Sequence, residues 1–107
     1  MKYVISVTWQ RLEARLSLKV QVLTYDQPTH FPSNLNTLPD RICGHRGVVS
    51  AQLSGTELQV VVSPLPDRVE NSTGQRLLDT ILEHIVEEIS IRLPECEVRF
   101  PHGRPTF

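Results

Sequence analysis

The chain has 107 residues, of which 39% are hydrophobic and 21% charged, and its formal net charge at pH 7 is −1. This length and composition predict a single domain, residues 1–107, whose core needs no metal or disulfide to fold. The balanced charge argues against a general attraction to nucleic acid. No apolar stretch approaches the roughly 20 residues that span a bilayer, so we expect no membrane partner.

The N-terminus predicts a cytoplasmic protein. One basic residue, Lys2, precedes a short apolar run that Ser6 and Thr8 interrupt, which is unlike the apolar core of a secretory signal peptide. Cys43 and Cys96 can form one disulfide at most, and a single bridge is weak evidence for secretion.

The first predicted unit is a β-hairpin. Apolar residues hold odd positions up to Trp9 and even positions from Leu12 onwards, and a two-residue turn at Gln10 and Arg11 produces such a switch. In this register Trp9 opposes Leu12, and all apolar side chains share one face. The rival interpretation is a helix that starts at Trp9, because Leu12 and Leu16 are also one helical turn apart.

A long loop is predicted at about residues 26–45, where three prolines interrupt the chain and neither strand nor helix periodicity is sustained. A structureless segment of this length is unusual in a compact domain, so it is either functional or contains a short element that the pattern does not show. Phe31 and Leu35 suit the loop to binding a protein partner. The alternative is that these side chains close one end of the core.

A second hairpin is predicted where residues 47–53 and 57–62 flank a Ser-Gly-Thr turn. Val49 begins the alternation of inward-facing apolar residues in the first strand. Val48 and Val61 fall between the alternating positions, which predicts that both faces of this strand pair are covered and that it lies near the sheet centre.

The clearest prediction is an amphipathic helix at about residues 77–93. Its apolar stripe consists of residues at helical spacing, namely Leu77, Leu78, Ile81, Leu82, Ile85, Val86 and Ile89. Residues 95–100 alternate charged and apolar side chains and predict a last strand, followed by an irregular tail at residues 101–107. The order β-β-loop-β-β-α-β predicts an α+β fold in which an antiparallel sheet of about five strands packs on one helix.

The polar side of this helix carries Asp79, Glu83 and Glu87 at four-residue spacing. This acidic row predicts either a solvated surface or a contact with a basic partner. His84 is explained most simply as one member of a surface pair with Glu87 or Glu88.

Two segments concentrate the residues that could perform chemistry: residues 43–47, Cys-Gly-His-Arg-Gly, and residues 102–104, His-Gly-Arg. With Cys96 they contain two thiols and two imidazoles, which is the composition of a zinc site. The spacing does not match common zinc sites, and Cys96 falls on the apolar side of its strand. We therefore predict neither a metal nor another cofactor.

The same two segments suggest a phosphodiester site. Arg46 and Arg104 can donate to phosphate oxygens, and His45 and His102 can act as acid and base if the segments converge. The simpler alternative is a tight turn with solvated arginines.

The common nucleotide-binding and hydrolase motifs are absent from the sequence. Our first hypothesis is a non-enzymatic protein-interaction or regulatory module that binds a protein through the loop with Phe31 and Leu35, a sheet edge or the tail. A homodimer formed through sheet edges is a variant of this hypothesis. The alternative is a nucleic-acid- or nucleotide-binding protein, in its catalytic form a metal-independent phosphodiesterase.

Overall fold

The structure is a computed structural model that describes residues 3–63, 71–93 and 95–106. These described residues form six strands, two α-helices and one short 3-10 helix. In chain order they are β1 (Tyr3–Leu12), β2 (Arg15–Thr24), β3 (Gln27–Thr29), the 3-10 helix η1 (Ser33–Leu35), α1 (Leu38–Cys43), β4 (Val48–Ser54), β5 (Glu57–Val62), α2 (Asn71–Arg92) and β6 (Cys96–Arg99). The predicted α+β class is confirmed.

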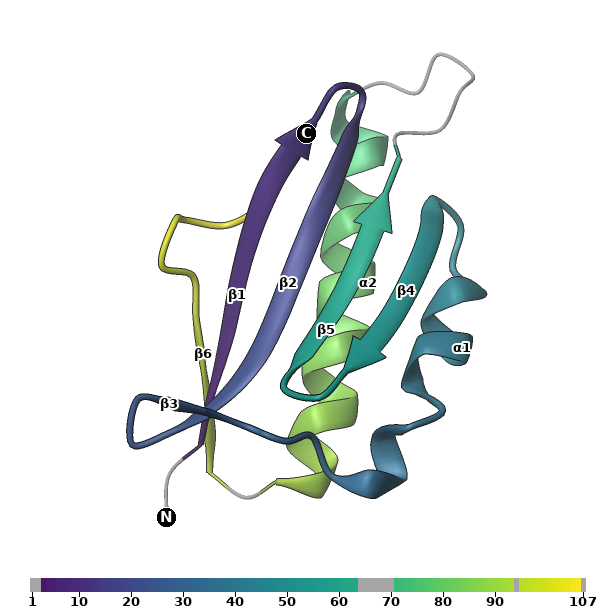
Figure 1. The fold of residues 1–107 in the computed structure, drawn as a ribbon. Helices are drawn as coiled ribbons and strands as arrows, with labels where there is room; N and C mark the ends of the chain where they lie inside the picture. The colour runs from purple at the N-terminus through teal and green to yellow at the C-terminus, as the bar shows by residue number, and fades with distance from the viewer. Residues whose placement is uncertain (1–2, 64–70, 94, 107) are drawn as a thin grey trace.

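The described strands form one sheet in the order β4-β5-β2-β1-β6, and β3 pairs with the end of β2. The long helix α2 packs against one face of this sheet, where it passes behind β5 and runs in the direction opposite to that strand (Figure 1). The chain therefore enters β6 in the same direction as β1, and these two strands pair in parallel. The other strand pairs are antiparallel, so the sheet is mixed and mostly antiparallel.

The core lies between the sheet and α2, as the helical stripe predicts. Ile81, Ile85 and Ile89 of α2 are at most 1% exposed, and each fully buried side chain of this kind stabilises the fold by about 1.5–3 kcal/mol. The sheet contributes alternate residues of its three central strands, namely Ile5, Val7, Leu16, Leu18, Val20, Val22, Leu58, Val60 and Val62. Within the described residues, no helix is long and apolar enough to cross a membrane.

The first hairpin forms, but its predicted turn is wrong. The strands continue to a turn at Glu13 and Ala14, so that Trp9 pairs with Leu18 rather than Leu12, a shift of six positions. Glu13 adopts a positive φ of 53° there, although glutamate is no better suited to this conformation than the residues of the expected turn. Because the shift is an even number, the inward face is the one predicted.

The second hairpin also forms, but only one of its strands lies inside the sheet, because β5 pairs on both sides. β4 is an edge strand, and an irregularity between Val48 and Ser50 shifts the register there. Val49 is therefore 46% exposed, and Val48 instead packs against the core. The consecutive valines reflect this β-bulge rather than burial on both faces.

The segment predicted as a loop at residues 26–45 contains β3, η1 and α1, which corrects that expectation. α1 lies alongside β4 (Figure 1), and Leu38 and Ile42, one helical turn apart, are at most 1% exposed. α1 has six residues and a proline in its first turn. A helix this short gives no sustained periodicity in the sequence and depends on tertiary packing for its stability.

Candidate functional site

A groove runs between α2 and β6, and we name it the α2–β6 groove. Seven residues line it: Leu82, Glu83, Val86, Glu87, Val98, Phe100 and Arg104. It forms because some apolar residues of α2 are fully buried against the sheet, whereas others, at the side of the helix, are only partly covered. Leu82 is 2% exposed, whereas Val86, Val98 and Phe100 pack against the core while remaining partly accessible. The groove thus has an apolar floor.

The charges around the α2–β6 groove are unevenly distributed. Glu83 and Glu87 are exposed and lie one turn apart on the helix. The guanidinium of Arg104 is 3.6 Å from Asp79 and 5.2 Å from the ring centre of Phe100. Arg104 is thus held at one end of the groove beside an acid, and the two glutamates give the helical rim a negative charge.

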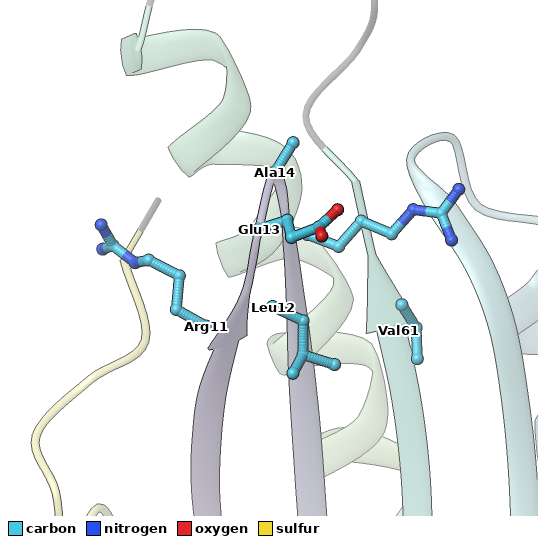
Figure 2. A pocket seen from close by; sticks show the side chains of 6 residues that line it. Arg11, Leu12, Glu13, Ala14 and Val61 are labelled. Carbon is cyan, nitrogen blue, oxygen red and sulfur yellow. The ribbon is translucent and has the colours of Figure 1, made fainter.

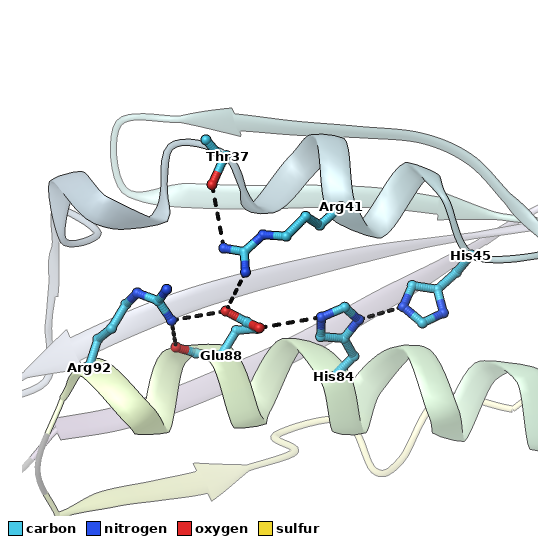
Figure 3. Close-up of polar contacts among 6 residues, drawn as sticks. All are labelled: Thr37, Arg41, His45, His84, Glu88 and Arg92. Atoms are coloured by element: carbon cyan, nitrogen blue, oxygen red, sulfur yellow. Dashed lines mark hydrogen bonds and ion pairs between the residues drawn. The ribbon is translucent and has the colours of Figure 1, made fainter.

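Glu88 is the centre of a polar cluster between α1 and α2 (Figure 3). Its Oε2 atom is 3.0 Å from a guanidinium nitrogen of Arg41 and 2.9 Å from one of Arg92. Arg92 also donates to the main-chain carbonyl of Glu88 at 2.9 Å. Partial burial opposes ionisation of Glu88, but the charges of Arg41 and Arg92 outweigh it and hold the carboxyl pKa below its ordinary value.

His84 extends this cluster to the chain segment that joins α1 to β4. Its Nε2 atom lies 3.6 Å from Glu88 Oε1, and its Nδ1 atom contacts Nε2 of His45. The two rings meet edge to face with their centres 4.7 Å apart. A neutral imidazole has one donor and one acceptor, so a proton on His84 Nε2 leaves Nδ1 to accept from His45. The predicted pair of His84 with Glu88 is confirmed, but His84 is part-buried and also contacts His45, so the pair does not lie on a freely solvated face.

We expect the cluster to give the protein an acid-sensitive contribution to stability. The folded-state pKa of Glu88 is lowered from 4.5, so this contribution is present above pH 4.5 and is lost as the pH falls through the folded-state pKa. At about pH 7, Glu88→Gln should have a lower free energy of unfolding than wild type. At about pH 3, the difference in free energy of unfolding between the two proteins should be smaller. Urea denaturation at both pH values measures this, with exposed Glu83→Gln as control. A gap that stays constant with pH contradicts the assignment.

The two apolar residues assigned to partner binding are buried. Phe31 is 9% exposed and Leu35 is 0% exposed, and both belong to the main core cluster. The second alternative from the sequence therefore holds: these side chains close one end of the core. Both side chains are therefore shielded from solvent in the folded structure.

The four residues of the suggested phosphodiester site are divided among three parts of the fold. His45 contacts His84 on the helical side of the sheet, and Arg46 is an exposed neighbour. His102 instead lines a pocket with Lys19 and other residues of the uncovered face, while Arg104 borders the α2–β6 groove. The geometry does not bring the two histidines to one phosphate.

The two cysteines are also separated. Cys43 is exposed at the end of α1, Cys96 begins β6 at the other edge of the sheet, and both thiols are free. Burial raises the pKa of the Cys96 thiol, whose sulfur donates to the Leu93 carbonyl at 3.3 Å. Within the part of the chain that the structure describes, no group of three or more His, Cys, Asp and Glu side chains is placed to hold a metal ion.

A broad pocket at the tip of the first hairpin is lined by Arg11, Leu12, Glu13, Ala14, Arg15 and Val61. Figure 2 shows that Arg11 and Glu13 point in different directions. Arg11 donates to the main-chain carbonyl of Thr106 at 3.0 Å. The charged groups do not converge on a common point, so this surface offers little chemistry.

Comparisons with protein-family models, with curated proteins and with solved structures found no match. Function must therefore be argued from the geometry.

The α2–β6 groove was not predicted from the sequence, although two signals for it were present: the acidic row on the helix and the apolar residues of the last strand. The contact between His45 and His84 was not predicted because nothing local in the sequence relates these two residues.

Proposed function

We propose that this protein is a cytoplasmic, non-enzymatic interaction module that binds an apolar and basic segment of a partner protein in the α2–β6 groove. The observation that carries the proposal is an accessible apolar floor beside an acidic rim. In this proposal the binding surface is the lining of the groove, and not Phe31 and Leu35, which are buried. The free thiols of both cysteines are in keeping with a reducing compartment.

The apolar floor supplies the driving force for association. Val86, Val98 and Phe100 come from two elements and line one continuous surface. A partner side chain that covers them removes apolar area from water, which favours binding roughly in proportion to that area. Apolar patches of this kind often mark interaction sites on protein surfaces.

The acidic rim selects the chemistry of the partner. Glu83 and Glu87 face solvent, and the one cation of the groove lining, Arg104, already lies near Asp79. A lysine or arginine of the partner can therefore approach the two glutamates without strong repulsion. Charge complementarity of this kind sets specificity and association rate more than affinity.

The test uses two fluorescein-labelled synthetic peptides, one alternating leucine with lysine and one alternating leucine with glutamate. At low ionic strength, fluorescence anisotropy should show saturable binding of the leucine–lysine peptide alone. The double substitution Glu83→Lys/Glu87→Lys should weaken that binding by about tenfold or more and admit the leucine–glutamate peptide. The matched control is Glu13→Lys/Glu95→Lys, which makes the same charge change at two exposed residues outside the groove.

The apolar half of the proposal needs its own variant. Val86→Ser should weaken binding of the leucine–lysine peptide at both low and high salt, because ions screen charges and have little effect on apolar burial. Ile91→Ser is the control, since Ile91 is 69% exposed on the same helix and is not part of the groove lining.

Two outcomes contradict the proposal. Equal losses in the groove variants and their controls would show that the peptide binds through net charge alone. A dimer in sedimentation experiments that the Val86→Ser substitution dissociates would show that a second copy of this chain occupies the groove.

A further inference from the structure

The sheet face opposite α2 carries a polar array built from three strands. In the strand register, Thr8 lies opposite Lys19, and Lys19 lies opposite Gln59. Gln10 lies opposite Ser17 in a second row. Residues directly opposite one another project to the same side of a sheet. Their alternating neighbours are in the core against α2, so these five side chains face away from the helix.

His102 reaches this face from the C-terminal tail. The tail turns at residues 100–103, where the Gly103 amide donates to the Phe100 carbonyl at 3.0 Å and Gly103 has a φ of 80°. The indole N–H of Trp9 donates to the Gly103 carbonyl at 3.1 Å and anchors the turn to β1. Together these residues enclose a pocket lined by Thr8, Trp9, Gln10, Ser17, Lys19, Gln59 and His102.

The hydrogen-bonding capacity of this pocket is directed mainly towards an acceptor ligand. Lys19 has three N–H donors, and Glu57, at 3.3 Å, is its ion-pair partner outside the pocket lining. Gln59 donates to the hydroxyl oxygen of Ser17 at 3.3 Å, which leaves the hydroxyl proton of Ser17 available. None of the described residues that line the pocket is acidic.

We propose that this pocket binds a small molecule through a phosphate monoester group. The ammonium of Lys19, the imidazole of His102, the Ser17 hydroxyl and side-chain amides line the pocket from three strands and the tail, while the Thr8 hydroxyl donates to the Lys19 carbonyl. Phosphate oxygens are acceptors that such donors hold through charge-assisted hydrogen bonds. The pocket volume of ≈ 340 Å³ is at the lower end of the range for small-ligand sites. The site lies on the other side of the sheet from the α2–β6 groove and is independent of the function proposed for it.

Three probes distinguish the sources of the phosphate group: inorganic phosphate, adenosine 5′-monophosphate and glucose 6-phosphate. Titration of each into the full chain at low ionic strength, followed by two-dimensional NMR, should give saturable shifts at Thr8, Ser17, Lys19 and Gln59 for at least one probe. Lys19→Gln should weaken this binding by about tenfold or more, because it removes a charged donor. The Lys19 side chain is 50% exposed, so the variant should fold, and its NMR spectrum verifies this.

The matched control is Arg46→Gln, which removes one positive charge at an exposed residue of the segment that leads into β4. The proposal requires this variant to bind within about twofold of wild type, and His102→Ala to bind more weakly. Equal weakening by Arg46→Gln and Lys19→Gln would overturn it, as would the absence of saturable binding for all three probes up to about 10 mM. Lys19→Gln should leave binding of the leucine–lysine peptide unchanged, so failures of the two proposals can be distinguished.

Discussion

Ile85→Asp should abolish folding of the domain. Ile85 is 0% exposed and lies on the face of α2 that packs against the sheet. The substitution removes buried apolar volume, which costs about 2–5 kcal/mol when isoleucine becomes alanine. It also places an unpaired carboxylate in an apolar environment, which adds several kcal/mol or forces the group to take up a proton. The sum approaches the total stability of a typical domain, about 5–15 kcal/mol.

Far-UV circular dichroism with urea denaturation measures this effect. Ile91→Asp is the matched control, because it introduces the same carboxylate on the same helix at a residue that is 69% exposed. An exposed acid near a helix C-terminus should cost less than about 1 kcal/mol. If Ile85→Asp keeps a cooperative transition near that of Ile91→Asp, the packing of α2 on the sheet is wrong.

The faces of strands and helices could be predicted because they depend on local periodicity alone. Alternation assigned Ile5, Val7 and Leu18 to the core side, and the structure places them there. The position of the turn depends instead on which pairing buries most surface, and the chain accepts a positive φ at Glu13 to extend the hairpin. An error of an even number of residues leaves the faces unchanged, which explains why the fold class was predicted correctly despite the wrong register.

The position of a strand within the sheet follows less reliably from its composition. Consecutive valines at residues 48–49 have two physical explanations, burial on both faces or a bulge that turns one valine outwards. The edge position of β4 and the exposure of Val49 show the second. Sequence periodicity cannot separate them, because a bulge changes the phase of the alternation within the strand.

The polar cluster around Glu88 could not be predicted for a related reason. Arg41, His45 and Glu88 meet only because α1 packs beside α2, and α1 itself is too short to be recognised. The polar pocket on the other face needs the corrected register, since Lys19 opposes Thr8 only when the hairpin turns at Glu13. In both cases the chemistry depends on tertiary pairing, whereas the sequence reports local preference.

Leu35→Ala should destabilise the fold by about 2–5 kcal/mol, the cost of truncating a fully buried leucine. Leu35 is 0% exposed within η1, where it packs in the same cluster as Phe31 and Leu38. A solvated binding loop would tolerate this change, whereas a segment that closes the core would not. The measurement is therefore a direct test between the two interpretations of residues 26–45.

Urea denaturation of Leu35→Ala against Asn34→Ala provides the comparison. Asn34 is exposed in the same short helix, so its truncation should change the free energy of unfolding by no more than about 0.5 kcal/mol. Equal and small effects at both residues would show that the segment is detached from the core. A large effect at Leu35 alone means that this side chain is committed to the core and that a partner cannot use it while the protein is folded.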